Sequence, residues 1–411
     1  MFNLKPLAAA VLVLSGIQAM ADDSSTLQIQ TGDDNIASAE QSFTGDNSTI
    51  TQNQAGEGND AMAVQNGALG SSITQTHGDT FNAAYADQWG ETGSSVQQVQ
   101  SGEWNDSFAS QSDGGGNAVI QSQDGTYQQS SVFQTFNQGS SAITSQTGSF
   151  NWASVEQDGD GAGNSAIISQ SGNDHFAGVV QLFNIEGEGI IQQNGDLHWA
   201  QVFQADGSGN TGTVIQEGLY NSAEVWQEFQ SNSQVSVYQD GSGAALNEVV
   251  AEQFEANDSQ ASLVQSGDEN AIALVQEILQ GGTVALTQTG FSHLHEVTQT
   301  GEGHVLAISS DGANNTVDAV QDGVNNELYF QQFDSDNLLT ADQSGEGNIA
   351  AGTSFGVGNE VQLTQSGVNG QAYVSQVGAG GNLASITQGG FNMTATIQQN
   401  GSGNQATVLQ Q

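Results

Sequence analysis

The sequence predicts an all-β protein whose chain winds into a β-solenoid with two short strands in each coil. Three observations predict this fold. A glutamine returns about every 11 or 12 residues from Gln30 to Gln410, which is the signature of a repeat array. Glycine occurs 53 times and proline once, as expected where nearly every backbone amide pairs in a strand ladder. No change in composition interrupts the repeat, and two serines, Ser310 and Ser354, stand where a glutamine is expected.

The stronger repeat reads Gln-x-Gly-x-x-Asn-x-Ala-x-x-x-Gln and contains one turn and one strand. Its glycine indicates a backbone with positive φ. The asparagine, small residue, apolar residue and glutamine that follow are two apart, so they share one face of a strand, which we expect to point inward. We assign a structural ladder and self-assembly role to Gln30, Gly32, Asn35, Ala37, Gln41, Gln54, Asn59, Gln65, Gln146, Asn151, Gln157, Gln216, Asn221, Gln227, Gln399, Asn404 and Gln410.

A looser step alternates with the stronger one, and we place its glutamine at Gln75 after Gln65 and at Gln192 after Gln181. One full unit is then about 23 residues, so the array holds about 16 or 17 coils. We expect strands of about five or six residues, with adjacent coils paired in parallel about 4.8 Å apart. Identical side chains then lie above one another, and each buried amide donates to one neighbour and accepts from the other.

Residues 1–21 have the pattern of a secretory signal peptide. Lys5 supplies a positive start, a short apolar run follows, and an Ala-Met-Ala cleavage site ends at Ala21. The apolar run is too short to span a bilayer. We therefore expect a secreted protein, with cleavage after Ala21 and no membrane insertion. A short segment, 22–29, precedes the continuous repeat domain 30–411.

The chain is a polyanion, with 45 acidic residues, one basic residue and a formal net charge of −44 at pH 7. The basic residue is Lys5, so cleavage leaves six histidines as the only possible side-chain cations. Nucleic acid is excluded as a partner because no positive charge is present to release its counterions. We expect inorganic cations as diffuse counterions and no cofactor. The absence of cysteine excludes disulfides and thiol chemistry.

Histidine is the residue type that could form a metal site. His175 and His198 occupy the asparagine slot of successive stronger repeats, so their rings should stack. His293 and His295 are two apart on one strand face, and His304 falls in the corresponding slot of the next half-repeat. Such imidazoles could hold Zn²⁺ or Cu²⁺, but no cysteine accompanies them. We expect histidine to replace asparagine as a hydrogen-bonding ladder residue, and we predict no metal site.

The stronger repeat resembles the curlin repeat of curli, the extracellular amyloid fibres of bacterial biofilms. The resemblance rests on the Gln-x-Gly-x-x-Asn-x-Ala pattern followed by glutamine, and it covers nearly the whole repeat domain. It implies an extracellular fibre subunit on the bacterial surface, exported through an outer-membrane secretion channel and polymerised on a nucleator subunit. It also implies roles in biofilm matrix, adhesion and surface colonisation. This chain departs from curlins in having far more repeats and only 22–29 before the first glutamine slot.

The outer surface offers weaker candidates. Turn acids such as Asp158 and Asp268 follow no calcium-binding spacing, so we favour diffuse cation condensation. Paired carboxylates can cleave glycosides, but an array with almost no insertions lacks the loops of a cleft, so we do not expect an enzyme. We favour lateral contacts between fibres over sugar binding for the outward aromatic residues Trp89, Trp104, Phe203, Trp226 and Phe229.

The alternative function is a monomeric secreted binding module, either an adhesive or an ice-binding rod. Such a rod needs capped ends and a flat, regular face. We expect open edges at both ends, which act as templates for another molecule. The outer face varies in side-chain type, unlike the uniform threonine rows that order water. These two features favour the fibre subunit over the rod.

Overall fold

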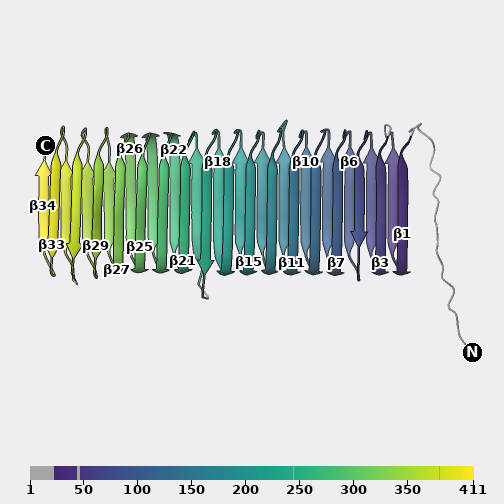
Figure 1. Cartoon of the computed structure of the whole chain (residues 1–411), viewed down its shortest axis with the longest axis horizontal. Coiled ribbons are helices and arrows are strands. Elements are labelled where there is room, and N and C mark those ends of the chain that lie inside the picture. The colour runs from purple at the N-terminus through teal and green to yellow at the C-terminus, as the bar shows by residue number, and fades with distance from the viewer. Residues whose placement is uncertain (1–22, 44–46, 244, 379) are drawn as a thin grey trace, which may run out of the picture.

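A computed structural model describes residues 23–43, 47–243, 245–378 and 380–411, and the predicted signal peptide lies outside them. The chain forms one straight stack of strands, with its first coil at one end and its last coil at the other (Figure 1). Strands and turns make up the whole described part, in which no helix occurs. The predicted all-β solenoid is therefore confirmed.

The strands form two parallel sheets of 17 strands each. Sheet A consists of the odd-numbered strands, each paired with the odd-numbered strands before and after it: β1 (Ser25–Asp33), β3 (Thr49–Glu57), β5 (Ser72–His77), β7 (Ser95–Glu103), β9 (Ala118–Thr126), β11 (Ser141–Ser149), β13 (Ser165–Asn173), β15 (Glu188–Asp196), β17 (Thr211–Leu219), β19 (Gln234–Gly241), β21 (Gln260–Asp268), β23 (Thr283–Phe291), β25 (Val305–Ala313), β27 (Glu327–Ser335), β29 (Ile349–Phe355), β31 (Gln371–Val377) and β33 (Thr394–Asn400).

Sheet B consists of the even-numbered strands in the same order: β2 (Ile36–Ser42), β4 (Asp60–Asn66), β6 (Ala83–Trp89), β8 (Asp106–Ser112), β10 (Gln129–Thr135), β12 (Trp152–Asp158), β14 (Phe176–Leu182), β16 (Trp199–Ala205), β18 (Asn221–Glu228), β20 (Asn247–Phe254), β22 (Ala271–Gln280), β24 (Leu294–Glu302), β26 (Thr316–Val324), β28 (Leu338–Gln343), β30 (Glu360–Gln365), β32 (Leu383–Gln388) and β34 (Gln405–Gln410). One odd strand and the even strand after it make one coil. The count of 17 coils agrees with the sequence.

Most strands are longer than the predicted five or six residues and reach 10 in β22, whereas β5, β28, β30, β32 and β34 have the predicted six. In strands of sheet A such as β11, the added length includes the glycine slot, through which the pairing continues. Gly148 in β11 pairs with Gly172 in β13, and it has a φ of 112°. A Cβ atom on Gly148 would lie 2.1 Å from the carbonyl oxygen of Gly172. Glycine is therefore required both by the backbone conformation and by the close approach of the next coil.

The core is one continuous apolar column between the two sheets, running from Ile50 to Ile397. Along each strand, inward and outward residues alternate, as in β12, where Ala153, Val155 and Gln157 are buried. The predicted inward face is therefore confirmed. A shift of one residue would turn this face to solvent, so burial fixes the register of every coil.

Candidate functional site

An unbroken glutamine ladder runs through sheet B from the first coil to the last. Every glutamine except the last donates its Nε2–H to the Oε1 atom of the glutamine in the next coil, at 2.7–2.9 Å. The ladder consists of Gln41, Gln65, Gln88, Gln111, Gln134, Gln157, Gln181, Gln204, Gln227, Gln253, Gln276, Gln299, Gln321, Gln343, Gln365, Gln388 and Gln410.

All these amides point the same way. The Oε1 atom of Gln41 has no glutamine before it and accepts a hydrogen bond from Thr26 Oγ1 at 2.9 Å. At the other end, Gln410 has no following glutamine and donates to the Thr394 carbonyl at 3.1 Å. The first coil therefore ends the ladder with an acceptor and the last coil ends it with a donor. The two ends of the rod are chemically complementary.

The corresponding ladder of sheet A is interrupted three times. Ser310 and Ser354 occupy two of the gaps, as the sequence indicated, and their hydroxyls donate to Gln332 and Gln376 at 2.8 and 3.0 Å. His77 occupies the third, between Gln54 and Gln100. The sequence prediction missed this third gap.

This gap was missed because the sequence prediction placed the glutamine slot at Gln75. That placement is wrong, since His77 pairs with Gln54. Gln75 lies two residues earlier and belongs to a second buried ladder of sheet A. In it each glutamine donates to the next at 2.7–2.9 Å. The members of this second ladder are Gln28, Gln52, Gln75, Gln98 and Gln121.

The slot at Gln192 is also wrong, by one residue. Gln193 is the buried ladder member, because it accepts from Gln170 and donates to Gln216, both at 2.9 Å. Gln192 is exposed. Two adjacent glutamines look alike in the sequence, and only the pairing of β15 with β13 and β17 separates them.

The gaps in the sheet A ladder are filled unequally. At Ser310, His295 reaches across from sheet B, and its Nε2 atom lies 2.7 Å from the serine hydroxyl. At His77, both ring nitrogens lack a hydrogen-bond partner, as does the Oε1 atom of Gln100 in the next coil. Burial lowers the pKa of His77 to about 4. This gap leaves three polar atoms unsatisfied in the core, each of which costs stability.

The asparagine slot forms another ladder, which connects the corners of successive coils. Asn59 shows the pattern: its Nδ2 atom donates to the Ala55 carbonyl four residues back, at 3.0 Å. Its Oδ1 atom accepts from the backbone N–H of Asn82 in the next coil, also at 3.0 Å. Asparagine therefore satisfies backbone groups of its own turn and of its neighbour.

Histidine makes the same two bonds in this slot. His175 donates from Nε2 to the Ser171 carbonyl, and its Nδ1 atom accepts from the His198 backbone N–H, both at 3.3 Å. The ring centroids of His175 and His198 lie 5.0 Å apart and nearly parallel, so the predicted stack is confirmed. Because Nδ1 must accept, the neutral ring is required. Burial lowers the pKa of both histidines, that of His198 to about 4.

The other two histidines of this slot follow the same pattern. His293 and His304 each donate from Nε2 to a carbonyl four residues back, at 3.0 and 2.8 Å. Each accepts at Nδ1 from a backbone N–H of the next coil, at 3.2 Å. Their ring nitrogens are thereby occupied. Within the described ranges, no three histidine or acidic side chains converge as metal ligands.

One buried acid, Glu91, was not predicted from the sequence. Glu91 lies in a corner of the coil, where Gly114 N donates to it at 3.0 Å and Ser94 Oγ donates at 2.5 Å. Burial raises the pKa of Glu91, and partial burial raises that of Asp87, which lies on the outward face of β6. Acids vary in position from coil to coil, so no repeating signal marks Glu91 as inward.

The residues assigned a ladder role lie in the predicted slots, and their burial depends on the coil. In the interior coils, Gln54, Asn59, Gln65, Gln146, Asn151, Gln157, Gln216, Asn221 and Gln227 are buried, and so is Gln399 in the last coil. In the first and last coils they are less covered: Gln30 and Gly32 are exposed, and Asn35, Ala37, Gln41, Asn404 and Gln410 are half-buried.

This difference arises because the end strands have one neighbour each. Among the described residues, β1 pairs with β3 alone and β2 with β4 alone. At the other end, β33 pairs with β31 alone and β34 with β32 alone. Each end of the rod thus presents two strand edges and the terminal side chains of the ladders.

The outward aromatic residues gather in short stacks. Phe81, Trp104, Tyr127 and Phe150 form one column along a corner, with ring centroids 4.6, 6.2 and 5.2 Å apart. All four have positive φ, between 55° and 59°, a strained conformation for bulky residues. Trp89 and Phe229 are also exposed, and Phe203 stacks on Trp226 at 4.0 Å.

These features define a repeat protein, a parallel β-solenoid stabilised by internal amide ladders. The family model described as the curlin associated repeat matches residues 335–367, which contain β28, β29 and β30. This match and the repeat-rich solenoid are consistent with a curlin-repeat protein, so the predicted resemblance is confirmed. No curated protein matches the chain. The described part contains no helix that could cross a membrane.

Proposed function

We propose that this protein is a self-assembling subunit of an extracellular amyloid fibre, stacked end to end. The curlin repeat and the β-solenoid fold suggest a curli-type structural protein. Both the family and the fold are structural rather than catalytic. Biofilm matrix, adhesion and surface colonisation are the roles that such a fibre would serve.

The observation that carries this proposal is the complementarity of the two end faces. Strand edges with unpaired N–H and C=O groups are templates for another chain. The last coil offers the Nε2 donor of Gln410, and the first coil offers the Oε1 acceptor of Gln41. Stacking the last coil of one molecule on the first coil of the next would continue the glutamine ladder of sheet B, and it would place Gln399 against Gln30 in sheet A and Asn404 against Asn35 at the corner. Joining two like ends would oppose donor to donor or acceptor to acceptor.

Fibre diffraction of the mature protein tests assembly itself. We expect unbranched fibres with a meridional repeat of about 4.7–4.8 Å and a rise in thioflavin T fluorescence. A protein that stays monomeric for days at tens of micromolar would contradict the proposal and favour the alternative, a monomeric binding rod.

Substitutions at the ends test the mode of assembly. Replacing Gln41 or Gln410 by Ala should lengthen the lag phase more than replacing Gln216, because only the end residues form the contact between molecules. Each lost partner leaves a polar group unsatisfied at a cost of about 1–3 kcal/mol. Equal effects at the ends and in the middle would indicate lateral association.

Several partners follow from the resemblance and belong to the same proposal. A nucleator subunit would start the fibre, and an outer-membrane channel would export the chain after removal of the signal peptide. Inorganic cations would screen the acidic residues as diffuse counterions. Capture of the precursor and the mature form from cell fractions would test secretion, because the mature form should lack residues 1–21.

A further inference from the structure

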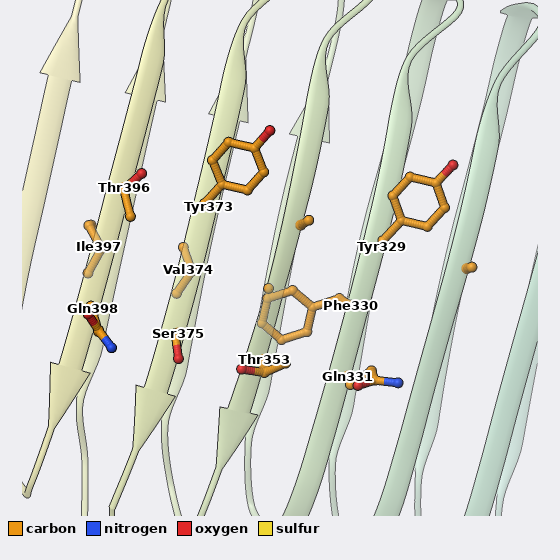
Figure 2. Close-up of a pocket in the computed structure, with 13 residues that line it drawn as sticks. Tyr329, Phe330, Gln331, Thr353, Tyr373, Val374, Ser375, Thr396, Ile397 and Gln398 are labelled. Atoms are coloured by element: carbon orange, nitrogen blue, oxygen red, sulfur yellow. The ribbon is translucent and has the colours of Figure 1, made fainter.

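A hollow lies on the outer face of sheet A near the C-terminal end of the rod (Figure 2). Its volume is about 510 Å³, and it spans the sheet A strands β25 to β33. Tyr329 and Tyr373 stand on either side of Ala351, in one outward row set by the strand register. The small Ala351 side chain leaves the space between the two rings open.

The two tyrosines form a matched pair. They are separated by two strand spacings, about 9.6 Å, and their hydroxyls point the same way in Figure 2. Tyr329 is 40% exposed and Tyr373 is 37% exposed. Beneath the tyrosines, the buried Phe330 ring occupies the space that a side chain on Gly352 would need. Gly352 is therefore partly exposed at the floor of the hollow.

A polar row runs beside the tyrosines, parallel to the rod axis. It consists of Gln331, Thr353, Ser375 and Gln398, at equivalent positions of four consecutive strands. Within the described part of the chain, no hydrogen bond occupies these four side chains. Amides and hydroxyls both donate and accept. The residues that line the hollow carry no charge, although the chain as a whole has a formal net charge of −44.

We propose that this hollow binds one strand of a neutral polysaccharide, lying along the rod axis. A pyranose ring presents C–H groups on one face, which suit the tyrosine rings, and hydroxyls at its edge, which suit the polar row. Aromatic side chains with a few placed polar groups are typical of ligand sites. A second copy of this chain would bring like charges together, and an anionic glycan would be repelled. A neutral glycan meets neither obstacle.

Titration calorimetry with two neutral hexasaccharides, one β-1,4-linked and one α-1,4-linked glucan, tests the proposal on freshly purified protein. We expect saturable binding of at least one of them. Tyr329→Ala and Tyr373→Ala should each weaken that binding about tenfold. Ala351→Gln should do the same by filling the hollow while both rings remain. Tyr85→Ala, which removes an outward tyrosine of sheet B, is the matched control and should have no effect.

Binding of neither sugar would overturn the proposal, and so would an equal loss of binding in the Tyr85→Ala control. Fibre bundling that changes in Ala351→Gln without any sugar binding would instead identify a second copy as the occupant. Thioflavin T growth curves of the same variants should match the unsubstituted protein, because the hollow lies on the side of the rod. Failure of sugar binding and failure of fibre assembly are thus separate results.

Discussion

Replacing Gln193 and its neighbour Gln192, one at a time, by alanine tests the ladder and its register together. Gln193→Ala would leave the buried Oε1 atom of Gln216 without its donor. An unsatisfied buried acceptor costs about 1–3 kcal/mol, and the cavity adds about 1 kcal/mol or more. We therefore expect Gln193→Ala to lower local stability by about 2–4 kcal/mol. Gln192 is exposed, so Gln192→Ala should change stability by less than about 0.5 kcal/mol.

Hydrogen–deuterium exchange is the appropriate measurement, because a repeat array need not unfold in one step. In Gln193→Ala, exchange should quicken in β13, β15 and β17, while distant coils keep their protection. Gln193→Met is a useful second variant, since it keeps the side-chain volume and removes the hydrogen bonds. Faster exchange in Gln192→Ala than in Gln193→Ala would refute the register, and equal exchange in the two would refute the energetic role of the ladder.

Four further predictions concern charge, protonation and the broken ladder. Burial lowers the pKa of His175 and His198, the latter to about 4, so their contribution to stability is complete above pH 6.5 and is lost as the pH falls from 6.5 to the lowered pKa values. The urea midpoint of the double substitution by Asn should therefore vary less between pH 7 and 4 than that of the unsubstituted protein. Burial raises the pKa of Glu91 above its ordinary 4.5, so its contribution to the stability of the fold is complete below pH 4.5 and is lost as the pH rises through the raised pKa. Glu91→Gln should therefore raise the urea midpoint at pH 7 and have little effect at pH 4. His77→Gln should stabilise the N-terminal coils by about 1–3 kcal/mol, because it gives the orphaned Gln100 Oε1 atom a donor, and slower amide exchange in β5 and β7 would show it. Fibre growth at pH 8 should accelerate with added salt or millimolar calcium and slow at very low salt, whereas rates that do not vary would point to specifically bound cations.

The sequence predicted the fold well because the same few slots recur in every coil. Period, inward face and coil number all follow from averaging over many copies, so a single irregular coil does not disturb them. The stacked pair His175 and His198 was predictable for the same reason, since each replaces an asparagine at a fixed slot. The length of strands such as β11 was underestimated because pairing continues through a glycine that was assigned to a turn, here Gly148.

Individual positions were less predictable where neighbouring residues offer the same chemistry. Gln192 and Gln193 are both glutamine, and Gln75 competes with His77 two residues away, so the pattern fits either choice. Cross-sheet compensation is also invisible in the sequence. His295 and Ser310 are 15 residues apart and meet only because the two sheets face each other.

One corner shows how little the ladders depend on the length of the chain between them. Five residues, 242–246, separate β19 from β20, where a single residue separates β17 from β18. Gln239 still donates to Gln265 at 2.8 Å across a spacing of 26 residues. The extra residues at this corner therefore leave the ladder bond between β19 and β21 unchanged. A foreign peptide inserted after Gly243 would be displayed once per subunit, so that an assembled fibre would carry it at regular intervals, as a scaffold for enzymes or affinity tags.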